Sequence, residues 1–151
     1  MTAPALSRPA RLSRGDFRLF RPLATRWMDN DVYGHVNNVV YYSYFDTVVN
    51  LYLVEQGVLD IEHSSVIGLV VETACQYFAP IAFPDIVSAG LRVAKLGTSS
   101  VRYEIGIFRA EDQSASAQGH FIHVYVDRVT RRPAPLAVPL RRALEKLLVS
   151  S

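Results

Sequence analysis

The chain has 151 residues, of which 50% are hydrophobic and 20% charged, and its formal net charge is +2. This composition suits one globular core and leaves no room for a second domain of ordinary size. The small basic excess argues against nucleic-acid binding, which needs a clustered positive surface. Because Cys75 is the only cysteine, no intramolecular disulfide can form, and we expect the reducing cytoplasm as the location.

The first 15 residues contain proline, serine and arginine but no apolar run long enough for a signal peptide. No later stretch reaches the ~18 uninterrupted apolar residues that a membrane-spanning helix needs. We therefore expect a flexible N-terminal tail over residues 1–15 and a single domain over residues 16–151, with no membrane span.

The first two elements along the chain are a strand and a helix. Residues 17–27 read as a strand, which Pro22 restricts to a sheet edge or a bulge. Residues 39–56 read as a helix that ends at Gly57. Its polar residues form one narrow stripe, so the helix is expected to be buried on almost every other side. These polar residues are Ser43, Asp46, Thr47 and Asn50.

The rest of the chain reads mainly as strands. Residues 66–80 and 85–97 are the first two, and apolar residues alternate strictly with Arg102 and Glu104 in the next. A strand over residues 116–128 follows, so the last three strands form an antiparallel meander, before a short amphipathic helix near the end. The pattern predicts an α+β fold, a curved, mostly antiparallel sheet of about five strands around a central helix.

A polar run between Arg26 and Asn38 precedes the predicted central helix. Asp29 and Asp31 are two residues apart on an extended segment, so their side chains point the same way. The helix N-terminus nearby offers unpaired N–H groups and a positive dipole end, which can stabilise a developing oxyanion. The run therefore predicts a site where a carboxylate and N–H donors meet, although an aspartate before a helix can also be a simple cap.

The stretch W-x-D-x-D-x-x-G-H-V-N-N-x-x-Y, from Trp27 to Tyr41, resembles the signature of the 4-hydroxybenzoyl-CoA thioesterase family of hotdog-fold acyl-CoA thioesterases. The resemblance extends from about Phe17 to Glu145. It implies a hotdog fold and hydrolysis of an acyl-CoA thioester to the free acid and CoA. We expect no metal and no organic cofactor.

The resemblance also assigns roles to residues of the polar run. It implies that Asp31 is the catalytic carboxylate, acting either as nucleophile through a mixed anhydride or as general base on water. The N–H near Asn38 would polarise the carbonyl, and Gly34 would allow close approach of the thioester. His35 would orient Asp31 or contact substrate, but a bond to backbone suits it equally. Asp46, on the central helix, is the rival catalytic carboxylate.

Binding residues are expected at two further places. Asn37 would position backbone or contact substrate, and the aromatic helix face that begins at Tyr41 suits either a long or ring-bearing acyl group or a packed core. The CoA phosphates would be held by cationic and hydroxyl side chains, because the chain has no glycine-rich phosphate loop. The candidates are Arg92, Lys95, Ser99, Ser100 and Arg102, with Arg128, Arg131 and Arg132 as a second group.

Other readings remain open. His120 and His123 are three residues apart on a predicted strand, so they face opposite sides and cannot share a metal. The alternatives to an acyl-CoA thioesterase are an acyl-carrier-protein thioesterase or another hotdog enzyme, and a non-catalytic acyl-CoA sensor. The apolar helix calls for a partner to cover it, so we expect at least a homodimer, with a homotetramer as the larger option. By the resemblance, each active site would take residues from two chains.

Overall fold

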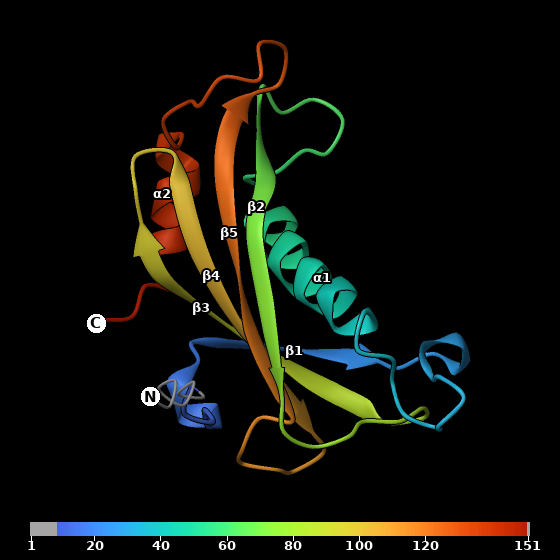
Figure 1. The fold of residues 1–151 in the computed structure, drawn as a ribbon. Coiled ribbons are helices and arrows are strands. Elements are labelled where there is room, and N and C mark those ends of the chain that lie inside the picture. Colours follow the sequence, from blue (N-terminus) through green and yellow to red (C-terminus); the bar gives the residue numbers. More distant parts are fainter. Residues whose placement is uncertain (1–8, 151) are drawn as a thin grey trace, which may run out of the picture.

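The computed structural model describes residues 9–150 as a five-stranded antiparallel sheet curled around one long helix (Figure 1). The strand order across the sheet is β1-β3-β4-β5-β2. This is the predicted α+β architecture. Neither helix longer than one turn could span a lipid bilayer within this part of the chain. The elements are η1 (Arg14–Asp16), β1 (Leu19–Ala24), η2 (Trp27–Asp29), α1 (Val40–Glu55), β2 (Val66–Tyr77), β3 (Ile86–Leu96), β4 (Ser100–Arg109), β5 (Ala117–Asp127) and α2 (Val138–Glu145).

Helix α1 lies in the hollow of the sheet and presents its aromatic and β-branched side chains to it. Phe45, Val48 and Val49 are fully buried, and they belong to one core cluster with residues of β3, β4 and β5. The predicted polar stripe is on the open side, where Ser43, Asp46 and Thr47 are exposed. The chain leaves the helix at Gly57, whose φ of 69° is the left-handed conformation that glycine adopts without strain.

Strands β3, β4 and β5 form the predicted meander, and alternate residues point into the core. Leu91 pairs with Ile105, and Val93 with Tyr103, on the face toward α1. Arg92 pairs with Glu104 on the outer face. Strand β1 is an edge strand, as the proline within it requires.

Strand β2 forms the other edge of the sheet, because it pairs only with β5. Its register shifts between Val70 and Glu72, which makes a β-bulge at Val71. Leu69, Val70 and Val71 are 38%, 47% and 60% exposed. The free edge of the sheet therefore carries a row of uncovered apolar side chains.

Helix α2 packs beside the C-terminal end of α1. Tyr52 of α1 donates a hydrogen bond of 2.6 Å to the carbonyl of Ala143. After α2, the N–H of Val93 bonds to the carbonyl of Leu147, 2.9 Å away. This is the short amphipathic helix expected near the end of the chain, and it begins at Val138 because Pro139 fits a first helical turn.

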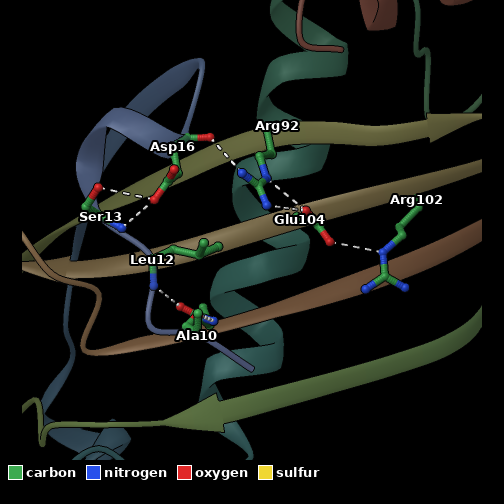
Figure 2. Close-up of polar contacts among 8 residues, drawn as sticks. Ala10, Leu12, Ser13, Asp16, Arg92, Arg102 and Glu104 are labelled. Atoms are coloured by element: carbon green, nitrogen blue, oxygen red, sulfur yellow. Dashed lines mark hydrogen bonds and ion pairs between the residues drawn. The ribbon is translucent and has the colours of Figure 1, made fainter. Parts of the chain in front are cut away.

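The segment from Pro9 to Asp16 lies against the outer face of the sheet (Figure 2). The Leu12 N–H donates to Oε1 of Gln118 at 2.7 Å, and Nε2 of Gln118 donates to the carbonyl of Ala10 at 2.8 Å. Residues 9–15, which we assigned to a tail, thus contact β5. Residues 1–8 of the expected tail lie outside the described residues.

A histidine stands inside the core. His123 on β5 is 5% exposed, and its ring lies 5.0 Å from the Tyr103 ring and 5.7 Å from the Phe121 ring, between centroids. Three residues earlier, His120 points to the outer face and bonds to Glu72 at 2.7 Å. The two histidines therefore face opposite sides of the sheet, as predicted. Burial lowers the pKa of His123 to about 4, so the ring is neutral near pH 7.

We expect this histidine to make the protein less stable in mild acid. Between pH 6.5, where an unfolded histidine titrates, and pH 4, the unfolded chain binds a proton that the folded chain does not. Stability should therefore fall by about 3 kcal/mol as the pH drops through this range. His123→Phe should remove this part of the dependence of stability on pH.

Urea unfolding at pH 7 and pH 5 measures the effect. Asp29, Glu55, Asp60 and Asp127 have lowered pKa values, so their contributions are lost only at lower pH and do not confuse the comparison. If the unfolding free energies of wild type and His123→Phe differed by the same amount at both pH values, this assignment would be contradicted.

Candidate active site

The polar run forms the loop between β1 and α1, and Asp29 anchors it. Asp29 is 1% exposed, and its Oδ2 accepts hydrogen bonds of 2.8 Å from the Arg26 N–H and from the Tyr44 hydroxyl. The Arg26 guanidinium lies 3.0 Å from Oδ1. Burial acts to raise the pKa of Asp29, but these bonds outweigh it and hold the pKa below its usual value. Asp29 is thus a charged structural group that fastens the loop to α1.

Asp31 stands in a tight turn directly after this anchor. Its N–H donates to the carbonyl of His35 at 2.9 Å, and the Gly34 N–H donates to the Asp31 carbonyl at 3.1 Å. Its side chain accepts the Tyr33 N–H at 2.8 Å. Gly34 has a φ of 81°, which explains the glycine at this point of the turn. The turn leaves the Asp31 carboxylate half-buried and able to accept further bonds.

The N–H of Asn38, which we expected to polarise the substrate carbonyl, lies in the backbone just before α1. The Val39 N–H donates to Oδ1 of Asn37 at 3.2 Å, and the Val40 N–H donates to the Asn37 carbonyl at 2.9 Å. Within residues 9–150, the Asn38 N–H has no such acceptor. The Asn38 carbonyl instead accepts the Tyr77 hydroxyl at 2.7 Å. A helix N-terminus with an unused N–H is suited to bind a carbonyl oxygen that gains negative charge.

Asp31 and Asn38 border the same hollow, which has a volume of about 380 Å³. It lies where the N-terminus of α1 meets the end of β2. Tyr41 forms its inner wall and packs edge to face against Tyr77, with ring centroids 5.1 Å apart. The hollow therefore combines a carboxylate, a helix N-terminus and an apolar wall. Its full lining is Asp31, Val36, Asn38, Tyr41, Tyr77, Phe78, Ala79 and Pro80.

Two other expected site residues lie apart from this hollow. The His35 side chain is exposed, and it is the backbone carbonyl of His35 that contacts Asp31. Asp46, the rival carboxylate, is on the exposed stripe of α1 more than one turn from Asn38, and it does not line the hollow. Partial burial raises the pKa of Asp46.

None of the expected CoA-binding side chains lines the hollow beside Asp31. Arg92 and Arg102 both pair with Glu104 on the outer face of the sheet, at 2.7 and 3.0 Å (Figure 2). Lys95 is exposed and pairs in register with Arg102. Ser99 lies in the β3–β4 turn, and Ser100 is the first residue of β4. The Ser99 carbonyl accepts the Tyr125 N–H at 2.7 Å.

Sequence reasoning missed two parts of the site. Tyr77 and its neighbours come from the end of β2, which meets the α1 N-terminus only through the fold. Tyr44 is the partner of Asp29, but in the sequence it is one of many aromatic residues of a buried helix. No local pattern marks either residue. Within residues 9–150, no group of three or more His, Cys, Asp or Glu side chains could hold a metal ion.

The family to which this chain belongs follows from its match to a known sequence family. The sequence matches the thioesterase-like superfamily over residues 25–144. The chain belongs to this superfamily. The match begins before the polar run and ends within the last turns of α2, so it includes the whole hollow described above. Comparison with curated proteins gives no significant match.

Solved structures confirm the hotdog fold of this superfamily member. The PA5185 protein of Pseudomonas aeruginosa is 52% identical, with 94% of this chain and 99% of that chain covered and a TM-score of 0.91. A 1,4-dihydroxy-2-naphthoyl-CoA thioesterase from Synechocystis is 19% identical, with 85% and 96% covered and a TM-score of 0.77. The BH1999 gentisyl-coenzyme A thioesterase is 23% identical, with 83% and 99% covered and a TM-score of 0.75.

The two aspartates should respond differently to the same substitution. Asp29→Asn puts an amide among the donors of Arg26 and Tyr44 and removes a buried charge, so we expect the unfolding free energy to fall by about 2 kcal/mol. Asp31→Asn keeps an oxygen for the Tyr33 N–H on a half-buried turn and should stay within about 0.5 kcal/mol of wild type. Urea unfolding of both variants tests this, and equal losses would contradict the anchoring role of Asp29.

Proposed function

We propose that this protein hydrolyses acyl-CoA thioesters to a free acid and CoA, with Asp31 as the catalytic carboxylate. Membership of the superfamily supports hydrolysis of a thioester in general. The observation that carries the finer proposal is that Asp31 and the N–H end of α1 at Asn38 border one hollow of about 380 Å³. A thioester placed there has a carboxylate on one side and a donor for its carbonyl on the other.

The reaction needs only these groups and water. As a general base, Asp31 removes a proton from a water molecule whose oxygen attacks the thioester carbon. As a nucleophile, it attacks that carbon itself and forms an anhydride that water then hydrolyses. On either route the carbonyl oxygen becomes an oxyanion beside the Asn38 N–H, the C–S bond breaks, and the CoA thiolate takes up a proton.

Asp31→Asn should therefore lower turnover on an acyl-CoA substrate by a factor of roughly a hundred or more, because it removes the base or nucleophile and keeps the shape. Release of the CoA thiol, followed with a thiol-reactive dye over aliphatic and aromatic acyl-CoAs, measures the rate. Asp46→Asn is the control and should keep most of the activity. If Asp31→Asn stayed active while Asp46→Asn did not, the catalytic role would move to α1.

We also propose that the active unit is at least a dimer formed through the free edge of β2. The single sheet covers α1 more fully than the sequence suggested, since mainly the polar stripe is exposed. Uncovered apolar side chains gather instead on β2, on the outer side of α1 and on the loop before it. They are Trp27, Met28, Val32, Tyr33, Val39, Leu51, Val54, Leu69, Val70 and Val71, each at least 37% exposed.

Pairing of β2 with its copy would complete the active site. A two-fold axis makes the two strands antiparallel, so the end of β2 at Tyr77 lies near the start of β2 at Val66 in the partner. Ser100 pairs with Val124, and Val124 with Leu69, so the β3–β4 turn is at the Val66 end. The partner's turn would therefore approach the Asp31 hollow, and Ser99 and Ser100 are our candidates for its contact with CoA.

Light scattering should thus give a molar mass of at least twice that of the 16.9 kDa chain. Val71→Glu should lower the mass and the thioesterase activity together, because a charge at the bulge opposes pairing of the edges. Val129→Glu, at an exposed valine after β5, is the matched control and should change neither. A fully active monomer, in wild type or in Val71→Glu, would contradict the shared site.

A further inference from the structure

A second hollow, of about 180 Å³, lies at the end of α1 that is far from Asp31. The last turns of α1, the start of β2, the middle of β5 and the segment after Gly57 enclose it. Its walls are mostly apolar, with three side chains that carry polar groups, Asn50, His123 and Tyr125, and the Tyr125 hydroxyl bonds to that of Tyr103. The remaining lining residues are Leu53, Leu59, Ile61, Ile67 and Gly68.

His123 is the unusual part of this wall. The ring is 5% exposed, and its Nε2 has no hydrogen-bond partner in the described part of the chain. Most buried polar groups in proteins are hydrogen-bonded, because an unpaired one costs free energy. A phenylalanine would fit among Tyr103, Phe121 and Tyr125 without that cost. The histidine thus has a hydrogen-bonding capacity that the fold itself does not use.

Gly68 leaves the His123 ring accessible to a ligand in the hollow. Its backbone is not in the left-handed region, so the conformation does not require glycine. A Cβ at this position would lie 3.0 Å from Nδ1 of His123 and 3.1 Å from the Tyr125 ring. The missing side chain therefore leaves open the space in front of Nδ1, and it is this ring nitrogen, not the fully buried Nε2, that a ligand in the hollow can reach.

The chemistry of the hollow selects its ligand. Apolar walls favour an apolar group, and a neutral imidazole can accept or donate one hydrogen bond at a ring nitrogen. Because burial lowers the pKa of His123 to about 4, the ring carries no charge with which to bind a carboxylate near pH 7. A hydroxyl group on an apolar body satisfies both requirements.

We propose that this hollow binds the far end of the acyl group and that His123 recognises a hydroxyl group there. The inference rests on the proposed thioesterase function. Within one chain, the hollow beside Asp31 lies at Tyr41 of α1 and the second hollow at Leu53, and these positions are ~18 Å apart along the helix axis. An acyl group whose carbonyl is beside Asp31 would then need a long aliphatic chain to reach the second hollow. Across a β2-paired dimer, the second hollow of one copy approaches Asp31 of the other, and a compact aromatic group would suffice.

Calorimetric titration of the full chain with free acids tests the binding step without catalysis. The probes are a long-chain fatty acid hydroxylated at its far end, a hydroxylated aromatic acid, and the unsubstituted parent of each. In one pair, we expect the hydroxylated acid to bind roughly ten-fold more tightly than its parent. The pair that shows this preference identifies the acyl class, and a preference in neither pair would overturn the proposal.

Substitutions then locate the preference. His123→Phe should abolish it while leaving the affinity for the parent acid within about two-fold, since only the hydrogen bond is lost. His120→Phe, on the outer face of the same strand, should keep it. Gly68→Ala should weaken binding of both acids, because a methyl group enters the hollow. A preference that persists in a folded His123→Phe protein would overturn the proposal.

The CoA thioesters of the same acids separate this inference from the proposed function. We expect the ratio of kcat/KM values, hydroxylated over parent, to fall about ten-fold in His123→Phe and to stay unchanged in His120→Phe. Hydrolysis with the same ratio in both variants would overturn the hydroxyl site and leave the function standing. Selective binding without hydrolysis of any acyl-CoA would contradict the function and leave the binding site standing.

Discussion

The burial of α1 in the hollow of the sheet is the constraint on which the other features depend. An aromatic helix such as this one is stable only when a sheet removes its side chains from water. Once Phe45 and Val48 are fixed in the core, Tyr44 meets Asp29 and holds the loop before the helix. Tyr52 meets the carbonyl of Ala143 and fixes α2. The same burial sets the N-terminus of α1 beside Asp31, so packing and site geometry have one origin.

Two aspartates, two residues apart, show how environment separates roles. Both come from one polar loop, and the sequence treats them as near equals. Asp29 is enclosed by the backbone N–H and the guanidinium of Arg26 and by the Tyr44 hydroxyl, which use up its oxygens and stabilise its charge. Asp31 receives a single backbone donor and borders open space. The first environment suits a structural anchor, and the second suits a group that must change its bonding during a reaction.

The sequence predicted the elements well where their signals are local. The apolar pattern of residues 39–56 gave α1 to within one residue at each end, and alternation put Arg102 and Glu104 on one face of β4. It could not tell that these two side chains pair with each other and with Arg92, since register between strands is a long-range property. Tyr77 and Gly68 were missed for the same reason. Their importance lies in what they meet from α1 and β5.

The proline in β1 has a consequence for how copies of this chain can associate. A sheet with two open edges could add further chains without limit and grow into a fibre. Here Pro22 interrupts the row of N–H groups on one edge, and the Arg21–Glu55 ion pair, 2.7 Å long, places charges beside it. In the described part of the chain, the β2 edge is then the sheet edge suited to a partner. If copies pair through it as proposed, one usable edge per chain ends strand addition after a single step, so the dimer would be closed and could not grow into a fibre.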